Sequence, residues 1–419
     1  MYSLLAGQQA SFFSPQNLID REAVPKVMDL LKLKLPIVIT GVRRCGKSSL
    51  MMLVRNKLKL SKTECLFVDF SDERFVNFEP TDFQKIEDYL VENKYNENSF
   101  LFIDEVQEVK YWEKGVNRLK EKHSIIITGS NSKLLSKEIA STLTGRSINL
   151  HLEPFSFREF LTAKNINIDN YFLDSKKQSL LRRAFTDYYK LGGFPKMVLL
   201  ENETILRELY DNILYRDVIA RLGSNFEKPV KELSVHFLSN PAEKTSTRKA
   251  SELMDVTNPL SVKKILNSFE NSFLFLFLSK FDFSIKKQIQ NPKKVYCIDN
   301  GFLTALGFKF SNNEGKMLEN LVAVELKRRS KNTYYFSDTK ECDFVIKDGN
   351  KIVEAIQVTW KITPENKERE ISGLMDALEK LNLKKGIILT YDQKEEWTEK
   401  GKTIAVKPVW QWLLEIERK

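Results

Sequence analysis

Eight residues near the N-terminus have the types and spacing of a phosphate-binding loop. Gly41 is followed by four residues and then by Gly46-Lys47-Ser48, which matches G-x-x-x-x-G-K-[ST] at every fixed position. Glycines let backbone N–H groups point at phosphate oxygens, and the N-terminus of the following helix adds positive potential. We expect the Lys47 ammonium to bind the β- and γ-phosphates and the Ser48 hydroxyl to coordinate Mg²⁺. The predicted nucleotide contacts are Gly41, Val42, Arg43, Arg44, Cys45, Gly46, Lys47, Ser48 and Ser49.

Two consecutive acidic residues suit the metal and water chemistry of such a site. Asp104-Glu105 follows the apolar run Leu101-Phe-Ile, so a buried strand would deliver Asp104 to its carboxyl end, where ligands bind in open α/β sheets. Asp104 is expected to hold Mg²⁺, mostly through water. Glu105 is expected to orient and deprotonate the water that attacks the γ-phosphate. A solvated acidic pair is the alternative, but Asp-Glu rather than a lone Asp favours hydrolysis over passive binding.

Two further polar positions could complete the site. Ser130 or Asn131, directly after Thr128-Gly, could hydrogen-bond the γ-phosphate or the attacking water, and a simple turn is the alternative. Arg146, in Thr-Gly-Arg, could stabilise transition-state charge as an arginine finger, in cis or across a subunit boundary. A surface arginine before an edge strand explains Arg146 nearly as well.

The elements that would position these residues alternate between short apolar strands and amphipathic helices. Strand patterns lie at residues 37–40, 65–70, 100–103, 125–128 and 147–152, and helical patterns separate them. Such alternation is typical of α/β proteins in which helices connect the strands of a parallel sheet. The N-terminal part is therefore predicted to be an α/β nucleotide-binding domain.

The rest of the chain predicts three further regions. Helical patterns dominate residues 161–240 and predict a helical lid over the first domain, residues 1–160. Two short helices and a hairpin, with arms at Phe273–Leu278 and Lys294–Ile298, predict a winged-helix domain over residues 241–311. From residue 312 to 419, α and β patterns alternate again and predict a second α/β domain.

Composition limits the classes of protein to which the chain can belong. Hydrophobic residues make up 42% of the sequence, which is enough for folded cores. The four cysteines are scattered, and none of the three histidines stands at a metal-binding spacing from another ligand residue. We therefore expect neither a disulfide framework nor a zinc site. The run 273–278 is far shorter than the ~20 residues that span a bilayer, and the N-terminus lacks the positive segment of a secretory signal. A soluble, cytoplasmic protein without a membrane partner is expected.

The net charge of +10 raises the question of an anionic partner. The charges are spread over the whole chain, so a solvated lysine-rich surface explains the excess as well as nucleic acid does. In the predicted winged helix, Lys263 and Lys264 would form only a thin basic face. DNA or another nucleic acid stays open as a partner, as does a second copy of the chain or another protein.

The motifs together resemble the prokaryotic AAA-type ATPases that carry a winged-helix region and a C-terminal PD-(D/E)xK nuclease-like domain of unknown function. Besides the phosphate-binding loop, the resemblance rests on Asp104–Gln107, Thr128–Ser130, Thr144–Arg146, Pro154–Phe160, Leu191–Pro195 and Tyr215–Asp217. It implies that the strand ending at Thr128 lies between the strands at 37–40 and 100–103. It also implies that Pro195 lines the adenine pocket, although Gly-Gly-Phe-Pro by itself indicates only a turn.

The last domain resembles the PD-(D/E)xK nuclease fold with one departure. Glu319, on a predicted helix, and Asp343, at the start of a predicted strand, stand where that fold has metal-binding carboxylates. An active nuclease also needs a carboxylate and a lysine, spaced E-x-K, on the next strand. Gln357 and Thr359 stand at those positions and replace neither charge. We therefore expect a catalytically degenerate domain that serves as a binding or structural scaffold.

These observations converge on one hypothesis and two alternatives. The hypothesis is an ATPase that binds ATP and Mg²⁺ and hydrolyses ATP to drive or switch a rearrangement of its domains or of a partner. One alternative is an ATP-dependent nucleic-acid-processing protein with metal-dependent nuclease activity. The other is a nucleotide-gated interaction protein that does not hydrolyse ATP.

Overall fold

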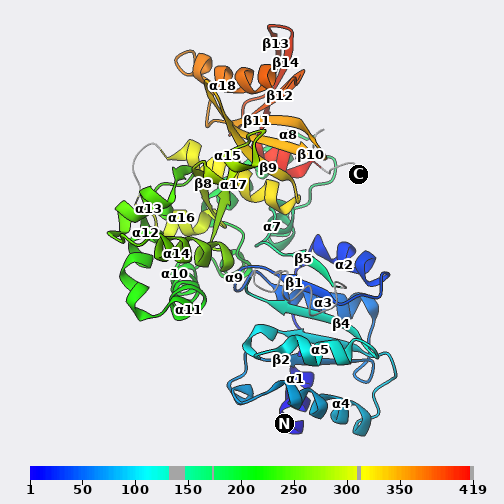
Figure 1. The fold of residues 1–419 in the computed structure, drawn as a ribbon. Coiled ribbons are helices and arrows are strands. Elements are labelled where there is room, and N and C mark those ends of the chain that lie inside the picture. Colours follow the sequence, from blue (N-terminus) through cyan, green and yellow to red (C-terminus); the bar gives the residue numbers. More distant parts are fainter. Residues whose placement is uncertain (132–146, 172–173, 309–312, 416–419) are drawn as a thin grey trace. The chain divides into compact units, whose positions relative to one another are not determined.

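The computed structural model describes residues 1–131, 147–171, 174–308 and 313–415. The chain forms two compact units (Figure 1). The first unit contains residues 1–154 together with 271–273, and the second contains residues 155–270 and 274–419. Each unit has its own sheet or sheets and its own buried core.

A five-stranded sheet forms the centre of the first unit. Its strands are β1 (Ile37–Thr40), β2 (Cys65–Asp69), β3 (Phe100–Asp104), β4 (Ser124–Gly129) and β5 (Ile148–His151). Their order is β2-β3-β4-β1-β5, and every neighbouring pair is parallel. The predicted parallel α/β sheet is therefore confirmed. The strand that ends near Thr128 lies between β1 and β3, as the family resemblance implies.

Helices cover this sheet because β1 to β4 are largely apolar and buried on both faces. The helices of the first unit are α1 (Tyr2–Phe12), α2 (Ala23–Leu31), α3 (Lys47–Leu58), α4 (Phe83–Glu92) and α5 (Trp112–Leu119), with short 3₁₀ turns η1 (Glu73–Phe75), η2 (Pro80–Asp82) and η3 (Val106–Glu108). One hydrophobic cluster joins α4 and α5 to a face of the sheet through Phe83, Ile86, Leu90, Trp112, Val116, Leu119, Val38, Leu66, Val68, Leu101, Ile103, Ile125 and Ile127. The apolar spacing in α4 and α5 is what places these side chains on one helix face.

Helix α1 closes the free edge of β2 with two glutamine side chains. The Gln9 amide donates to the carbonyls of Lys62 and Cys65 and accepts from Phe67 N–H. The Gln8 amide pairs in the same way with the N–H and carbonyl of Asp69, at 3.0 Å each. An edge strand left open presents unpaired backbone groups to other chains. Here the two amides satisfy several of them.

The second unit begins with a run of helices, as the sequence predicts for residues 161–240. They are α7 (Phe157–Ala163), α8 (Ser175–Leu191), α9 (Pro195–Leu200), α10 (Thr204–Asn212), the π-helical turn η6 (Ile213–Ile219), α11 (Ala220–Leu222), the 3₁₀ turn η7 (Ser224–Phe226) and α12 (Glu227–Ser239). Ser156 caps α7, and its side chain and that of Glu159 form a reciprocal capping box.

A small antiparallel sheet and two helices follow. The sheet has the order β6-β8-β7, with β6 (Glu243–Thr245), β7 (Phe275–Leu278) and β8 (Lys293–Cys297). Helices α13 (Thr247–Met254) and α14 (Pro259–Asn271) precede β7, and α15 (Ile285–Gln290) lies between β7 and β8. The two helices and both arms predicted from the sequence are thus present.

The C-terminal part contains a six-stranded mixed sheet with the order β13-β14-β12-β11-β10-β9. Its strands are β9 (Asn332–Ser337), β10 (Glu341–Asp348), β11 (Lys351–Val358), β12 (Lys385–Thr390), β13 (Glu395–Glu399) and β14 (Lys402–Pro408). The helices of this part are α16 (Asn300–Leu306), α17 (Glu314–Arg328), α18 (Lys367–Lys380) and α19 (Val409–Leu414). Helix α18 packs against the sheet through Leu374, Ala377 and Leu378.

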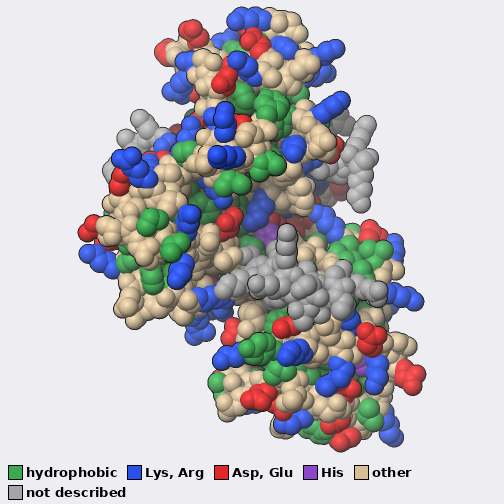
Figure 2. Space-filling model, in the orientation of Figure 1, with side chains coloured by type: hydrophobic (Ala, Val, Ile, Leu, Met, Phe, Trp, Pro, Cys, Tyr) green, Lys and Arg blue, Asp and Glu red, His purple; other side chains and the backbone are tan. Residues whose placement is uncertain are grey.

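The surface carries charges of both signs. Figure 2 shows lysines and arginines dispersed among aspartates and glutamates over both units, without a single basic stripe on the face in view. In the part of the chain that the structure describes, no helix is long and apolar enough to cross a bilayer.

A glycine on α5 provides a test of the packing in the first unit. A Cβ atom at Gly115 would lie 2.1 Å from the buried ring of Phe83, so Gly115→Ala forces the α4–α5 contact apart. Overpacking of this kind lowers the free energy of unfolding by about 1–3 kcal/mol, although alanine is the better helix former by ~1 kcal/mol. We expect a lower midpoint of urea unfolding.

Gly7→Ala on α1 is the matched control, because nothing lies within 4 Å of its Cβ position. This variant should be at least as stable as the wild type, because only the helix-propensity gain applies. Equal shifts in both variants would contradict the packing described here.

Candidate active site

The predicted phosphate-binding loop connects the end of β1 to the start of α3. Gly46 has φ 104°, a left-handed conformation that glycine adopts readily, and α3 begins at the next residue. Among the described residues, no side chain caps the N-terminus of α3. Backbone N–H groups at an uncapped helix N-terminus bind anions, so the loop has the geometry that phosphate recognition requires.

The Lys47 ammonium lies buried inside this loop. Its side chain is 3% exposed, and Nζ donates to the carbonyls of Gly41 at 3.1 Å and Val42 at 3.3 Å. Glu105 Oε1 is 3.4 Å from the same nitrogen. Burial lowers the pKa of Lys47, but Glu105, Cys45 and Asp104 together outweigh it and the net shift is upward. Lys47 is therefore a cation fixed in the middle of the loop.

Asp104, the last residue of β3, contacts the end of β4 and the start of α3. Its Oδ2 accepts a 2.5 Å hydrogen bond from Ser48 Oγ, and its Oδ1 accepts from Thr128 Oγ1 at the end of β4. Burial and then the neighbouring Glu105 raise the pKa of Asp104 to about 6. Hydroxyl and carboxylate oxygens are the ligands that Mg²⁺ takes in proteins. The chemistry of this pair therefore fits the predicted metal.

Glu105 follows Asp104 in a left-handed backbone conformation, with φ 48° and ψ 45°. The backbone N–H of Glu105 donates to Thr128 Oγ1 at 3.1 Å, and its carboxylate accepts from Gln107 Nε2. Burial raises the pKa of Glu105, but Lys47 and the Gln107 hydrogen bond outweigh it and the pKa falls below the usual value. The side chain is therefore a carboxylate, as a general base must be.

The remaining predicted residues are Ser130, Arg146, Pro195 and the other members of the loop. Ser130 is fully buried after β4, and Gln107 Nε2 lies 3.5 Å from its hydroxyl. The same Gln107 nitrogen donates to Glu105, so Ser130 lies close to the predicted base. Arg146 lies outside the described residues. Pro195 belongs to the second unit, where it is the first residue of α9. Within the loop, Val42 and Cys45 are buried, Arg43 and Ser49 are half-buried, and Arg44 is exposed.

Two residues of the site have no counterpart in the sequence-based prediction of roles. Arg21 is buried and donates to the carbonyls of Cys45 at 2.9 Å and Glu153 at 2.7 Å, so it fastens the loop to the residues after β5. Gln107 binds the Glu105 carboxylate. Gln107 is the last residue of the Asp-Glu-Val-Gln motif, and that motif is the sequence signal that could have identified it. Arg21 had no signal, because it precedes its partners by 24 and 132 residues.

The Gly-Gly-Phe-Pro motif of the second unit is held by a buried aspartate. Asp299 Oδ2 accepts from Gly193 N–H at 2.7 Å, and Oδ1 accepts from Gly301 N–H at 2.8 Å. A Cβ on Gly192 would lie 1.7 Å from Asp299 Oδ1, and one on Gly193 would lie 2.3 Å from the Phe155 carbonyl. Both glycines are therefore required by close approach, and the motif is a packing element whatever else it does.

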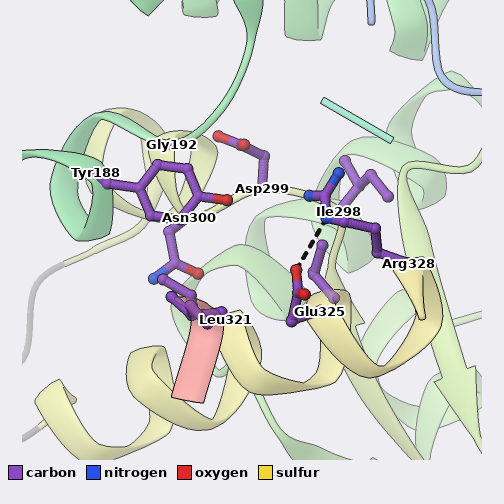
Figure 3. Close-up of a pocket in the computed structure, with 10 residues that line it drawn as sticks. Tyr188, Gly192, Ile298, Asp299, Asn300, Leu321, Glu325 and Arg328 are labelled. Atoms are coloured by element: carbon purple, nitrogen blue, oxygen red, sulfur yellow. Dashed lines mark hydrogen bonds and ion pairs between the residues drawn. The ribbon is translucent and has the colours of Figure 1, made fainter. Parts of the chain in front are cut away.

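This aspartate lines a small polar cavity of about 20 Å³. Tyr188, Glu325 and Arg328 also line it, and Arg328 Nε donates to Glu325 at 2.9 Å (Figure 3). A cavity of this size holds about one water molecule. Burial raises the pKa of Asp299 to about 7, although two N–H donors and Arg328 oppose the shift.

The carboxylates predicted for the last domain come together around a lysine. Lys294 on β8 is 2% exposed, and its Nζ lies 2.8 Å from Glu319 Oε1 and 2.9 Å from Asp343 Oδ1. Glu341 Oε1 is also 2.8 Å away. Burial lowers the pKa of Lys294, but Asp343 and Glu319 outweigh it and raise it well above the usual value. An ammonium of this chain thus lies among three acidic side chains and offsets part of their charge.

Gln357, which the resemblance to the nuclease fold sets at the position of a further carboxylate, takes part in the same network. Its Oε1 accepts from Asp343 N–H at 3.3 Å and its Nε2 donates to Glu370 at 3.2 Å. Thr359 is buried just after β11. Within the described residues, no group of three or more His, Cys, Asp or Glu side chains is arranged to hold a metal ion.

The raised pKa of Asp299 predicts a pH-dependent stability. A carboxyl that binds its proton more tightly in the folded chain destabilises the fold as pH rises from the unfolded value, ~3.9, through the folded value of about 7. Asp299→Asn cannot ionise but loses one acceptor for an N–H group. We therefore expect this variant to be clearly less stable than the wild type at pH 5, with the difference narrowing by pH 8. Urea unfolding at each pH measures it.

Asp211→Asn, at an exposed position on α10, is the control and should follow the wild type at every pH. A difference between Asp299→Asn and the wild type that stays constant from pH 5 to 8 would contradict the shift.

Comparisons with known proteins find similarity along most of the chain. A model described as an AAA domain matches residues 34–161, and two models of domains of unknown function match residues 182–314 and 314–412. An uncharacterized protein of Methanocaldococcus jannaschii is 35% identical over 400 residues, covering 90% of this chain and 88% of that protein. An uncharacterized protein of Haemophilus influenzae is 33% identical over 426 residues, covering 97% and 99%.

Among solved structures, a Walker-type ATPase of Pyrococcus abyssi is similar with a TM-score of 0.45 and 14% identity, over 70% of this chain and 98% of that one. The identities with the archaeal and bacterial proteins, which extend over most of each chain, decide the relationship. The chain belongs to the same family as these proteins of M. jannaschii and H. influenzae, and its N-terminal part is an AAA-type P-loop domain.

Proposed function

We propose that this protein binds ATP with Mg²⁺ and hydrolyses it to switch the arrangement of its units or of a partner. The observation that carries the proposal is the arrangement of Lys47 and Ser48, after β1, with Asp104 and Glu105, at the end of β3, on the same edge of the sheet. Ser48 contacts Asp104, and Lys47 contacts Glu105. A buried cation, a metal-type oxygen pair and a carboxylate base are the parts that phosphoryl transfer to water needs.

Each of these residues has a role that follows from its contacts. Lys47 is proposed to bind the β- and γ-phosphates, because its ammonium is already fixed inside the loop. Ser48 and Asp104 would hold Mg²⁺, which when bound neutralises charge on the phosphate oxygens. Glu105 would orient the attacking water and accept its proton. The loop residues Gly41 to Ser49 would supply the N–H groups that surround the phosphates.

The ion pair between Lys47 and Glu105 suggests how binding prepares the site. Its 3.4 Å separation is longer than a strong charge-assisted hydrogen bond, so a phosphate can compete for the ammonium. When Lys47 turns to phosphate, the Glu105 carboxylate loses that partner and becomes available to a water molecule. Nucleotide can switch the protein only if it binds one arrangement more tightly than another.

Three residue roles remain part of the proposal. Ser130 would hydrogen-bond the γ-phosphate or the attacking water, supported by its burial and its position 3.5 Å from the Gln107 amide. Arg146 would stabilise transition-state charge, supported by its Thr-Gly-Arg context. Pro195 would line the adenine pocket, supported by the motif that Asp299 holds.

The second unit is proposed to contain a helical lid, a winged-helix domain and a nuclease-like domain. The helices α13 and α14 with the β6-β8-β7 sheet support the winged helix. Glu319 on α17 and Asp343 on β10 support the nuclease-like domain. Lys263 and Lys264 are exposed on α14. Nucleic acid, a second copy of the chain and another protein remain candidate partners.

The nuclease alternative is disfavoured by Lys294. A metal-dependent nuclease of this type needs its carboxylates to hold a divalent cation, whereas here Glu319 and Asp343 both bind one buried ammonium. Gln357 supplies no charge at the further position, and its amide is engaged with Glu370. We therefore propose a scaffold role for this domain.

Replacing the general base tests the proposed hydrolysis. Glu105→Gln keeps the size of the side chain but cannot accept the proton of water, so the steady-state rate should fall by roughly 100-fold or more. ATP binding, followed by a fluorescent nucleotide or by calorimetry, should persist. Each protein is assayed with Mg²⁺, with and without DNA.

Glu108→Gln, on an exposed neighbouring carboxylate, is the control and should hydrolyse ATP like the wild type. Binding without turnover by wild type under every condition would favour the nucleotide-gated interaction protein. Absence of binding would overturn the proposal altogether.

Removing the buried ammonium tests the scaffold interpretation. Lys294→Met leaves three carboxylates without their shared cation, so the free energy of unfolding should fall by about 3–5 kcal/mol. Lys244→Met is the matched control, because Lys244 pairs with the same Glu341 but is 40% exposed. This control should lose less than ~1 kcal/mol.

Urea unfolding measures the free energy of unfolding of both lysine variants and of the wild type. Nicking of supercoiled plasmid by the wild type with Mg²⁺ or Mn²⁺ that disappears in Asp343→Ala would establish the nuclease alternative instead.

A further inference from the structure

Gln107 bridges the ends of two central strands in the first unit. It lies in the 3₁₀ turn η3, directly after β3, and its side-chain amide nitrogen donates to Glu105 Oε2. The same nitrogen lies 3.5 Å from Ser130 Oγ, after β4. One amide group therefore touches the proposed base and lies beside the proposed γ-phosphate or water contact.

The two oxygens of Glu105 are held by different groups. Oε1 lies 3.4 Å from the Lys47 ammonium and Oε2 accepts from Gln107. If phosphate draws Lys47 away, the Gln107 amide still binds the carboxylate, and the charge of Arg43 still acts on it. The carboxylate would otherwise rotate freely about its terminal bonds, because χ3 of glutamate is broad.

The other end of the Gln107 amide is also informative. Its Oε1 is buried and, within the described residues, has no hydrogen-bond partner. A buried polar atom without a partner is destabilising by about 1–3 kcal/mol, so packing alone does not explain the carbonyl oxygen of this amide. An acceptor beside a general base is suited to the second O–H of the water that the base activates.

We propose that Gln107 is a positioning residue for ATP hydrolysis, which holds the Glu105 carboxylate at the angle where it meets the attacking water. The inference rests on the hydrolytic function proposed above. It assigns to the fourth residue of Asp-Glu-Val-Gln a part in the rate of the chemical step rather than in ATP affinity. A residue that only stabilised η3 would affect folding and binding, and its effect would not depend on Glu105.

Four proteins test this inference: wild type, Gln107→Met, Glu105→Gln and the double variant. Methionine keeps the length of the side chain but has no N–H donor, so we expect kcat to fall by about 10- to 100-fold. The dissociation constant for ATP should change less than about threefold, which is under 1 kcal/mol. In the Glu105→Gln background, Gln107→Met should cause little or no further loss, because the group it positions is gone.

Gln84→Met is the matched control, since Gln84 is exposed on α4 and bonded to Asp88 of the same helix. It should keep the wild-type kcat, and thermal unfolding should show that every variant is folded at the assay temperature. An unchanged kcat in Gln107→Met overturns the inference. An equal loss in both backgrounds, or a matching rise in the ATP dissociation constant, also overturns it.

The outcomes separate this inference from the function on which it rests. Hydrolysis by the wild type with a normal rate in Gln107→Met overturns the role of Gln107 alone. A wild type that binds ATP but never hydrolyses it overturns the proposed function and the inference with it.

Discussion

A charge buried in a folded chain needs an opposite charge or strong hydrogen bonds beside it, and this constraint shapes both acidic sites of the protein. Lys47 is held by two backbone carbonyls and by a carboxylate 3.4 Å away, partners that a phosphate can replace. Lys294 is held by three carboxylates at 2.8–2.9 Å, and all of them would lose their shared cation if this side chain turned away. The same chemical pairing is therefore exchangeable in the first site and locked in the second.

The geometry of the first site depends on strands that end side by side. Because β1, β4 and β3 are parallel neighbours, their carboxyl ends lie along one edge of the sheet. Thr128 uses this adjacency: its hydroxyl donates to Asp104 and accepts from the N–H of Glu105. One hydroxyl thereby places two acidic residues for which different roles are proposed. The left-handed turn at Glu105 then directs its side chain back toward Lys47.

In the second unit, close packing explains the residue types of the Gly-Gly-Phe-Pro motif. Gly192 and Gly193 leave no room for a side chain, because Asp299 and the Phe155 carbonyl occupy that space. Phe155 N–H in turn donates to the Gly193 carbonyl, which ties the Pro-Phe motif to the Gly-Gly motif. Residues that look like a ligand-binding signature thus have a structural reason to be where they are.

The amino-acid sequence alone determined the local chemistry: the parallel α/β order of the first unit, the phosphate-binding loop and the acidic pair. These features are readable because they depend on neighbours within a few residues, such as a strand followed by Gly46-Lys47-Ser48. The helices and hairpin arms after residue 241 were readable for the same reason.

Only the tertiary structure decided which distant groups meet. Arg21 reaches the carbonyl of Glu153 across 132 residues, Gln8 and Gln9 close the edge of β2, and Lys294 fills the acidic cluster from another sheet. Such contacts produce no periodic pattern in the sequence. A single polar residue is predicted to be exposed, and only the folded structure shows that it is buried. A buried partner is set by strand order and packing, and these are properties of the folded chain rather than of any short segment of it.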